Sequence, residues 1–425
     1  MSPPKILISG SGIAGSVFAF WLLRAYPLAH ITITERAPSL LLTGASVDIR
    51  SSAVDVIKAM NLEPLIRARS THESGIQWVR ADGSPVGTIE ATGRSDIQTF
   101  TSEYEIFRGE LASIFITPVR DRVRLLFDES VERFENCEDE DGVQVTFTRS
   151  KRREKYDLLV AADGLGSKIR GAMFDCSPRE HIFDEGVHAA YFTINRDLLQ
   201  GSQLAKGFNA PGGRVIYLRP DPSPAGRTRA MLLSVTRKSD KARKERLNAA
   251  LRDGPESYMQ LMEEEFRGAG WRAEEILRGM RETDDFYASF FGQVRAPALQ
   301  KGRVVLLGDA GYATPGFGTS LAIMGGYVLA GEMLRHKGDV RAAVEGYEGI
   351  MLPFARESQG GVVGEYAAQV LNPQSEWGIA VLHAVVRVVT GLRLHKLAMG
   401  VAAALGVTDK KLSMPEYRWP KEGEV

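Results

Sequence analysis

The chain has 425 residues, a length at which two or three structural units are expected and large cores form without disulfide bonds. Apolar residues make up 44% and charged residues 25% of the sequence, which excludes a disordered chain, a collagen-like chain and a membrane protein with many spans. The 53 basic residues equal the 53 acidic residues, so the charge balance speaks against nucleic-acid binding, and two cysteines are too few for a disulfide framework or a four-cysteine zinc site.

A signal peptide would lie at the start of the sequence, and a membrane-contacting segment would lie in its most apolar stretch. No basic region precedes the first apolar run, so we expect no signal peptide and, given the cysteine usage, a cytoplasmic protein. The apolar stretch 377–407 contains Arg387, Arg393, His395 and Lys396, and its valines recur at helical spacing. We therefore predict a C-terminal helix packed on the body of the protein, and regard membrane-surface contact as the less favoured alternative.

The first residues predict a βαβ unit. Lys5–Ser9 is typical of a buried strand, residues 16–26 of a buried helix and residues 31–34 of a second strand. The turn between the first strand and the helix reads Gly10-Ser-Gly-Ile-Ala-Gly15 and matches the dinucleotide-binding pattern Gly-x-Gly-x-x-Gly. In that pattern the first glycine permits a tight turn, the second lets a pyrophosphate approach the backbone, and the third lets the helix pack on the strand.

Glu35 strengthens this interpretation because it follows Gly15 by twenty residues and ends the second strand. A carboxylate at this position can accept hydrogen bonds from the ribose hydroxyls of an adenosine. The bland alternative is a glycine-rich turn with Glu35 on the surface. The glycine pattern alone does not separate NAD from FAD.

The middle of the chain predicts a change of pattern near residue 185. Before it we expect helices over 51–69 and 105–116, a hairpin of Gly75–Val79 with Pro85–Glu90, and strands over 122–127, 143–148 and 156–160. After it we expect strands over 187–194, 214–218, 229–235 and 286–294 and helices over 241–267 and 271–281. A strand over 302–308 and a helix over 320–336 follow. Segments typical of a nucleotide-binding fold thus occur at the start of the chain, near residue 160 and near residue 305. The segments between them would form a second unit folded back onto the first.

Two further turns contain acidic residues that follow a predicted strand. One strand ends in Asp163-Gly164 and runs on to Arg170, and another ends in Gly308-Asp309 before the loop Pro315-Gly-Phe-Gly318. Each is a common turn by itself. Together with the first turn, and in this order, they resemble the three fingerprints of the group A flavin-dependent aromatic monooxygenases, the para-hydroxybenzoate hydroxylase-like enzymes. The resemblance covers most of residues 5–345, and within the family the branch of tetracycline-inactivating monooxygenases is the most similar at Gly44–Arg50, Glu105–Leu111 and Tyr327–Glu332.

The resemblance implies an α/β fold with a Rossmann-like FAD-binding domain of the glutathione-reductase type, an inserted α+β substrate domain over a β-sheet, and a C-terminal helix. The FAD-binding domain would comprise residues 1–72, 99–180 and 296–345. The substrate domain would comprise residues 73–98 and 181–295, and a C-terminal helical segment residues 346–425.

The resemblance also implies roles for single residues. The ADP half of FAD would lie against the first turn and the end of the second strand, Arg108 would reach the ribityl–phosphate region, Asp163 would lie near the pyrophosphate, and Asp309 would bind the ribityl chain. The loop before the helix over 320–336 would lie by the isoalloxazine ring, where a helix N-terminus stabilises the reduced anion. The cofactor-binding residues expected are Gly10, Gly12, Ile13, Ala14, Gly15, Glu35, Arg36, Arg108, Asp163, Asp309, Pro315, Gly316, Gly318, Thr319 and Ser320.

One segment departs from the family pattern. The family commonly has Gly-Gln-Gly-x-Asn where this chain has Gly316-Phe-Gly-Thr-Ser320, and the loop after Asp309 is shorter. Backbone contacts to a flavin survive this change, whereas contacts from the glutamine and asparagine side chains do not. The change puts in doubt the detailed position of the ring.

The resemblance implies an FAD-dependent monooxygenase that consumes NADPH or NADH and transfers one oxygen atom of dioxygen to an aromatic or polycyclic small molecule through a flavin hydroperoxide. The alternatives are an FAD-dependent oxidase or alkene reductase on the same fold, and a binding protein that has lost flavin. No metal is expected, because the histidines and cysteines show no metal-ligand spacing. The expected catalytic residues are Asp48 and Arg50, which would face the flavin ring or the substrate; an ordinary ion pair at a strand end is the alternative. The expected substrate-binding residues are His188, Tyr191, Tyr217 and Phe317; for the first three, core or sheet packing is the alternative.

Overall fold

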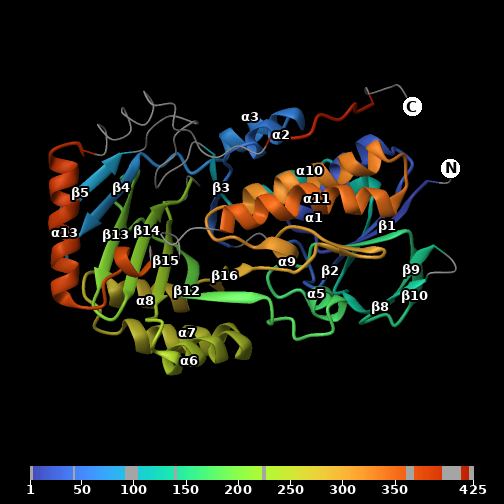
Figure 1. Cartoon of the computed structure of the whole chain (residues 1–425). Helices are drawn as coiled ribbons and strands as arrows, with labels where there is room; N and C mark the ends of the chain where they lie inside the picture. Colours follow the sequence, from blue (N-terminus) through green and yellow to red (C-terminus); the bar gives the residue numbers. More distant parts are fainter. Residues whose placement is uncertain are drawn as a thin grey trace.

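The computed structural model describes residues 3–41, 44–90, 104–137, 141–222, 226–359, 368–394 and 413–420. Two large sheets lie at opposite ends of an elongated body (Figure 1), one beside the N-terminus and one beside the C-terminal helix α13 (Glu376–Gly391). The structure confirms the α/β class with a Rossmann-like parallel sheet.

The first sheet has six strands in the order β17-β18-β11-β1-β2-β7, with bounds Gln300–Lys301, Val304–Leu306, Leu158–Ala161, Lys5–Ser9, His30–Glu35 and Arg124–Phe127. All neighbours are parallel except β17 and β18. The strands β11, β1 and β18 are apolar runs that are almost wholly buried, as expected of a parallel sheet covered on both faces.

Helices and a small sheet cover this parallel sheet. The longest neighbours are α1 (Ile13–Ala25), α4 (Arg108–Ile116), α10 (Gly318–Arg335) and α11 (Val340–Gln359). Helices α1 and α10 approach closely, because a Cβ on Gly326 would lie 2.9 Å from the backbone nitrogen of Phe18. Shorter elements complete this half of the molecule: α2 (Ala53–Ala59), α3 (Glu63–Ala68), a 3-10 turn (Arg120–Arg122), α5 (Lys168–Met173), α9 (Asp309–Tyr312), and the antiparallel sheet β8 (Val131–Cys137), β9 (Gly142–Phe147) and β10 (Arg153–Tyr156).

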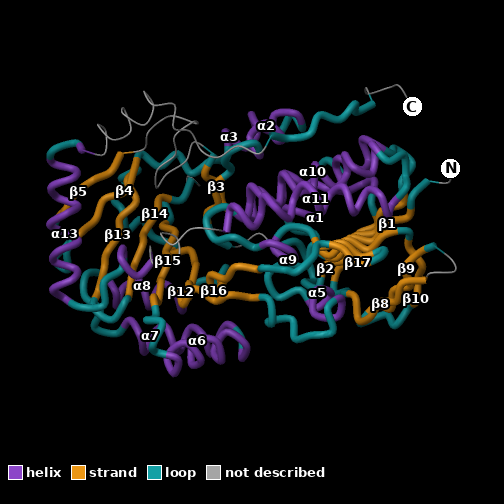
Figure 2. Tube along the Cα trace, in the orientation of Figure 1, coloured by secondary structure: helices purple, strands orange, loops and turns teal. Residues whose placement is uncertain are grey.

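The second sheet has seven strands in the order β16-β12-β15-β14-β13-β4-β5. Their bounds are Tyr287–Val294, Ile182–Ile194, Thr228–Val235, Arg214–Pro220, Leu204–Ala210, Gly75–Val79 and Pro85–Glu90. The early hairpin β4–β5 therefore joins strands that lie far later in the chain, through a parallel pairing of β4 with β13. Helices α6 (Lys241–Asp253), α7 (Pro255–Phe266) and α8 (Ala273–Arg281) pack on one face (Figure 2), which leaves the other face toward the parallel sheet.

Helix α13 lies along the outer strand β5 and contacts it through Val386 and Thr390, whose side chains close on Gly87. Its exposed apolar side chains include Trp377, which is 78% exposed, and Val385, which is 53% exposed. Among the described residues, no helix combines the length and the hydropathy needed to cross a bilayer. A second C-terminal contact is made by Trp419, which packs at 4.5 Å between ring centroids on Trp21 of α1.

The structure corrects several predicted elements. The helix expected over 105–116 begins only at Arg108, because Glu105–Phe107 forms β6 and pairs with β3 (Ser46–Asp48). The helix expected over 241–267 is broken at Gly254, whose φ is +109°, and at Pro255, which lacks an N–H donor. The strands β8 and β13 were not predicted, since β8 is largely charged and exposed and β13 contains lysine, glycine and asparagine.

Candidate active site

Three turns far apart in the sequence meet at one edge of the parallel sheet. Strands β1, β11 and β18 are neighbours and run in the same direction, with Ser9 opposite Ala161 and Ala161 opposite Leu306. The turns that follow them therefore open at the same carboxyl edge, the usual position of ligand sites in open α/β sheets. Contacts between the turns are direct, since a Cβ on Gly308 would lie 2.8 Å from the Cβ of Ala14.

The first turn connects β1 to α1. Gly10 has a φ of +113°, and a Cβ there would collide with the carbonyl oxygen of Ala162 in the second turn. Gly12 begins the helix with no side-chain cap, and a Cβ on it would meet no other atom within 4 Å. The structure thus places Gly10, Gly12, Ile13, Ala14 and Gly15 around an uncapped helix N-terminus, which favours an anion.

Glu35 ends β2 and turns its carboxylate toward this turn. It accepts a hydrogen bond from the Ser11 hydroxyl at 2.8 Å and from the Ala37 amide at 3.0 Å. Ser11 was not among the predicted residues, and its hydroxyl group holds the Glu35 carboxylate against the glycine turn. Arg36, the next residue, is exposed.

Asp163 lies in the second turn, directly after β11. Burial raises the pKa of its carboxyl group, although a hydrogen bond from Ser167 and the charge of Arg170 act in the opposite direction. One carboxyl oxygen, Oδ1, is buried and has no hydrogen-bond partner among the described residues. A buried acceptor left in this state indicates a place where a ligand group donates a hydrogen bond.

Asp309 begins α9 in the third turn and points at the start of α10. A Cβ on Gly318 would lie 3.1 Å from Asp309 Oδ1. Burial raises the pKa of Asp309, and the charge of Arg108 lowers it, so the structure brings Arg108 into the electrostatic range of Asp309. Helix α10 has no side-chain cap at its N-terminus, where Gly318, Thr319 and Ser320 form the first turn after Pro315 and Gly316.

The two-stranded ribbon β3–β6 connects this edge with the second sheet. Asp48 and Arg50 form an ion pair at 2.8 Å, and the backbone N–H of Arg50 donates to the Ser320 hydroxyl at 2.9 Å. The ion pair that the sequence left as an alternative is therefore present, and it lies at the N-terminus of α10. On the other strand of the ribbon, Glu105 is opposite Asp48 and is buried.

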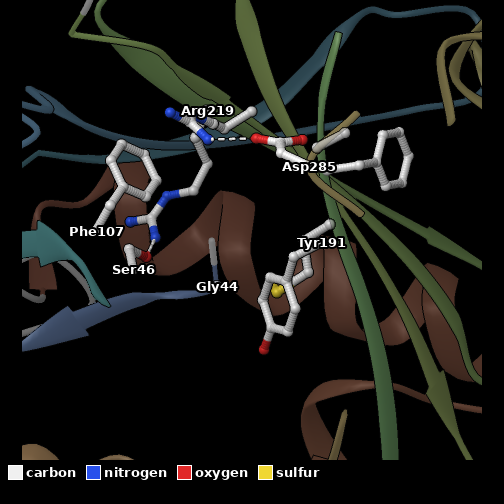
Figure 3. Close-up of a pocket in the computed structure, with 10 residues that line it drawn as sticks. Gly44, Ser46, Phe107, Tyr191, Arg219 and Asp285 are labelled. Carbon is white, nitrogen blue, oxygen red and sulfur yellow. Dashed lines mark hydrogen bonds and ion pairs between the residues drawn. The ribbon is translucent and has the colours of Figure 1, made fainter. Parts of the chain in front are cut away.

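A pocket lies between the ribbon and the second sheet (Figure 3). It encloses about 390 Å³ of space not filled by atoms, including its opening to solvent. Ser46 and Phe107 lie on the ribbon side and Tyr191 and Asp285 on the sheet side. The remaining lining residues are Gly44, Phe192, Arg219, Arg229, Ala230 and Met231. Gly44 lines this pocket and also lies close to Arg108 at the edge of the parallel sheet, because a Cβ on Gly44 would lie 3.5 Å from the Arg108 side chain.

Aromatic side chains form a row across the pocket face of the second sheet. Tyr191 is opposite Tyr287 on β16 and opposite Met231 on β15, and Met231 is opposite Tyr217 on β14. The Tyr191 and Tyr287 rings lie 6.0 Å apart. Burial raises the pKa of Tyr217 to about 12 and that of Tyr191 further, so both phenols stay protonated near neutral pH. The structure thus brings two of the four predicted substrate residues onto one surface.

The other two predicted substrate residues lie elsewhere. His188 is fully buried on the opposite face of β12, where α6 packs, and burial lowers its pKa. Because side chains alternate along a strand, His188 and Tyr191 point to opposite faces. Phe317 precedes α10, and its ring packs edge-to-face against Phe354 of α11 at 6.2 Å. Neither residue lines the pocket.

Several residues of the site were missed from the sequence. Ser46 and Phe107 belong to the ribbon, whose pairing is long-range, and Arg219 and Arg229 were hidden in ordinary strand patterns. The available signal was the position of Arg219 and Arg229 in strands that otherwise place apolar side chains on both faces.

The edge of the parallel sheet fits FAD on features of this structure. It combines the uncapped N-termini of α1 and α10, the open space over Gly12, and the unpartnered Asp163 Oδ1. These features suit an extended dinucleotide with a central pyrophosphate. Within the described part of the chain, no group of three histidine, cysteine or acidic side chains is arranged to hold a metal ion.

Curated proteins similar to this chain include flavin-dependent monooxygenases. The FAD-dependent monooxygenase asL4 of Sarocladium schorii is 34% identical over 415 residues, which is 92% of this chain and 93% of that protein. Monooxygenase CTB7 of Cercospora beticola is 31% identical and covers 97% of each chain. No family model matches the sequence.

Solved structures give the same picture. The crystal structure of the tetracycline destructase Tet(51) matches with a TM-score of 0.74 and 26% identity, over 98% of this chain and 99% of that one. Klebsiella pneumoniae HpxO complexed with FAD and uric acid matches with a TM-score of 0.68 at 19% identity, over 96% of this chain and 97% of that one, which shows a shared fold.

Proposed function

Because this chain belongs to the FAD-dependent monooxygenases of group A, we propose that it oxidises NADPH or NADH and inserts one oxygen atom of dioxygen into an aromatic or polycyclic small molecule. The observation that supports the proposal is that three turns lie together at one sheet edge, next to a pocket. The turns after β1, β11 and β18 share one sheet edge, and Gly44 connects that edge with the pocket under the second sheet.

We assign the cofactor to residues of the shared edge. Gly10, Gly12 and Gly15, with the uncapped start of α1, would hold the pyrophosphate, and Glu35 would bind the adenosine ribose. Arg108 and Asp309 would hold the ribityl–phosphate region, and Asp163 would offer its free Oδ1 to a donor of the cofactor. These residues come from segments 1–72, 99–180 and 296–345, the proposed FAD-binding domain.

Bound FAD would supply the redox chemistry by accepting a hydride from NAD(P)H, reacting with dioxygen and donating one oxygen atom to the substrate. The chain's own residues would orient and shield this reaction. The N-terminus of α10 would place partial positive charge beside the isoalloxazine ring, where negative charge accumulates on reduction. The Asp48–Arg50 pair is fixed to that helix through Ser320 and would position the ring edge nearest the pocket.

We propose that the substrate lies on the row formed by Tyr191, Met231 and Tyr217. These side chains present a broad, apolar and aromatic surface, on which flat ring systems bind by stacking and burial. Phe107 lines the same pocket from the ribbon side (Figure 3). The segments 73–98 and 181–295 would make up this substrate domain.

The test combines the absorbance spectrum of the purified protein with analysis of the product formed in labelled dioxygen. The purified protein is expected to be yellow, to oxidise NADPH or NADH faster in the presence of an aromatic substrate, and to place labelled oxygen from dioxygen in the product. A yellow protein whose product contains no labelled oxygen would indicate an oxidase or an alkene reductase instead. A protein that takes up no FAD would overturn the proposal as a whole.

A further inference from the structure

Two arginines lie side by side at the wall of the pocket. Arg219 on β14 is directly opposite Arg229 on β15, and both line the pocket beside Met231. Like charges directly opposite each other in a sheet are destabilising unless they are compensated. A pair of free arginines in such a pocket would be a strong site for a substrate carboxylate, which guanidinium groups bind in a bidentate manner. Whether their guanidinium N–H groups are already bound to protein carboxylates therefore determines which substrate groups can bind at this end of the pocket.

Arg219 is held by two carboxylates from other parts of the chain. Arg219 and Glu73 form an ion pair in which Arg219 Nε lies 2.7 Å from Glu73 Oε1, and a terminal nitrogen of Arg219 donates a hydrogen bond to Glu73 Oε2 at 2.9 Å. The same terminal nitrogen also donates to Glu105, and the second one donates to Ser46. The side chains of Glu73 and Glu105 are only 1% and 6% exposed, so these carboxylates are fixed partners that water does not replace.

Arg229 is compensated in the same way. Its Nε donates to Asp221 at 2.5 Å, and one terminal nitrogen donates to Asp285 at 3.0 Å and to the Thr193 hydroxyl at 2.7 Å. Its guanidinium group also lies over the Phe107 ring, 4.5 Å from the centroid. Burial acts to raise the pKa of Asp285, but hydrogen bonds from Thr193 and Thr283 and the charge of Arg229 lower it overall, so Asp285 is ionised.

We infer, on the basis of the proposed function, that this end of the pocket takes an uncharged oxygen-bearing group, such as a phenol or a ring carbonyl, and rejects a carboxylate. Among the described residues, the two arginines of the pocket wall face four carboxylates, those of Glu73, Glu105, Asp221 and Asp285. Asp221 is shared with one more arginine, Arg227, at 3.4 Å. The wall therefore carries no excess of positive charge for a substrate anion to neutralise.

A second physical reason acts in the same direction. A carboxylate that entered the pocket would lose its water and would approach the ionised Asp285 as a like charge. A neutral hydroxyl or carbonyl group carries neither cost, and it can exchange hydrogen bonds with Ser46 or with a guanidinium N–H. The apolar surface of Tyr191 and Met231 would contact the ring system of such a molecule.

The test uses a matched pair of probes on the FAD-loaded full chain. We would titrate 2-naphthol and 2-naphthoate and record the change in absorbance of the bound flavin, which reports binding without turnover. The wild-type protein is expected to bind 2-naphthol at least about tenfold more tightly than 2-naphthoate, the size expected of one unsatisfied charge.

Two variants make the inference falsifiable in the other direction. Glu73→Gln removes one carboxylate partner of Arg219, and Asp285→Asn removes one partner of Arg229, so each is expected to tighten 2-naphthoate binding by about tenfold through a new charge-assisted contact. Two variants are used because either one alone could fail to fold. Glu245→Gln removes the partner of the exposed Arg252 and serves as the control, with no change in either affinity.

The inference is overturned if the wild-type protein binds the two probes equally, if it binds 2-naphthoate more tightly, or if neither variant gains affinity for 2-naphthoate. Failure of the proposed function has a different signature, since a protein without bound FAD shows no flavin absorbance to follow. A yellow protein with an unchanged naphthoate affinity in both variants therefore refutes the inference alone.

Discussion

Glu105 on the ribbon strand β6 and Arg219 on β14 of the second sheet form a buried ion pair that joins the two halves of the molecule. Burial and the nearby carboxylates of Glu73 and Asp48 raise the pKa of Glu105 to about 7, although the charge of Arg219 opposes this shift. Arg219 lines the pocket, so the pair lies at the pocket wall, and its charge changes near neutral pH.

The first prediction concerns the pH dependence of stability. Because the pKa of Glu105 is higher in the folded chain than in the unfolded chain, its contribution to stability is complete below the unfolded value and is lost as the pH rises to about 7. Glu105→Gln is expected to remove this loss, so its free energy of unfolding relative to wild type rises by on the order of 2 kcal/mol between pH 5 and pH 8. Urea unfolding at both pH values measures the difference, with Glu245→Gln as the control. A variant that follows the wild-type profile would contradict the prediction.

The second prediction concerns Gly12. Its φ is −70° and a Cβ on it meets no protein atom, so Gly12→Ala is expected to leave the fold and the melting temperature of the FAD-free chain unchanged. The added methyl group would occupy the space proposed for the pyrophosphate, and FAD affinity is expected to fall by about tenfold or more. Flavin fluorescence on titration gives the affinity. Gly349→Ala, where a Cβ also meets nothing, is the matched control. Unchanged FAD binding in Gly12→Ala would remove the first turn from the proposed site.

The third prediction concerns Asp309. Its buried carboxylate carries a desolvation cost that a bound cofactor would offset through hydrogen bonds. Asp309→Asn is expected to keep or slightly raise the stability of the FAD-free chain and to weaken FAD binding by about tenfold. Calorimetry of the FAD-free and FAD-loaded forms separates the two effects, and Asp253→Asn on the surface is the control. Equal losses of stability in both forms would indicate a purely structural role.

The fourth prediction uses the two faces of strand β12. Tyr191 lines the pocket and His188 packs under α6, three residues away. Tyr191→Ala is expected to weaken 2-naphthol binding by about tenfold, because a stacking surface is lost, whereas His188→Leu is expected to leave it unchanged. Flavin absorbance titration of both variants provides the comparison. Equal effects of the two substitutions would refute the assignment of the substrate to the face that carries Tyr191.

The same His188 variant has a distinct pH signature. Burial lowers the pKa of His188 below its ordinary value, so its contribution to stability is present above about pH 6.5 and is lost as the pH falls through the folded-state pKa. His188→Leu is expected to gain stability relative to wild type at pH 5 and not at pH 8, opposite in sign to the change for Glu105→Gln. Unfolding curves that show the same difference at both pH values would contradict it.

Much of the proposed cofactor edge was predictable from local sequence. The glycine turn, Glu35, Asp163 and Asp309 each follow a short apolar strand, and the parallel pairing of β1, β11 and β18 then places the turns at one edge. Local patterns suffice here because a buried strand and a glycine turn are specified by neighbouring residues. The pocket was less predictable. His188 and Tyr191 lie on opposite faces of β12 although both were expected to bind substrate, and the pairing of β3 with β6 joins segments almost sixty residues apart.

By itself, the sequence determined the α/β class, the order of strands and helices around the three turns, and the family to which the chain belongs. Only the tertiary structure decided which charges meet: that Arg219 is enclosed by Glu73 and Glu105, that Arg229 is bound to Asp221 and Asp285, and that the ribbon β3–β6 reaches the second sheet. The reason is physical. Turns and strands depend on the conformational preferences of adjacent residues, whereas an ion pair depends on the distance between groups that the chain brings together only when its sheets are assembled.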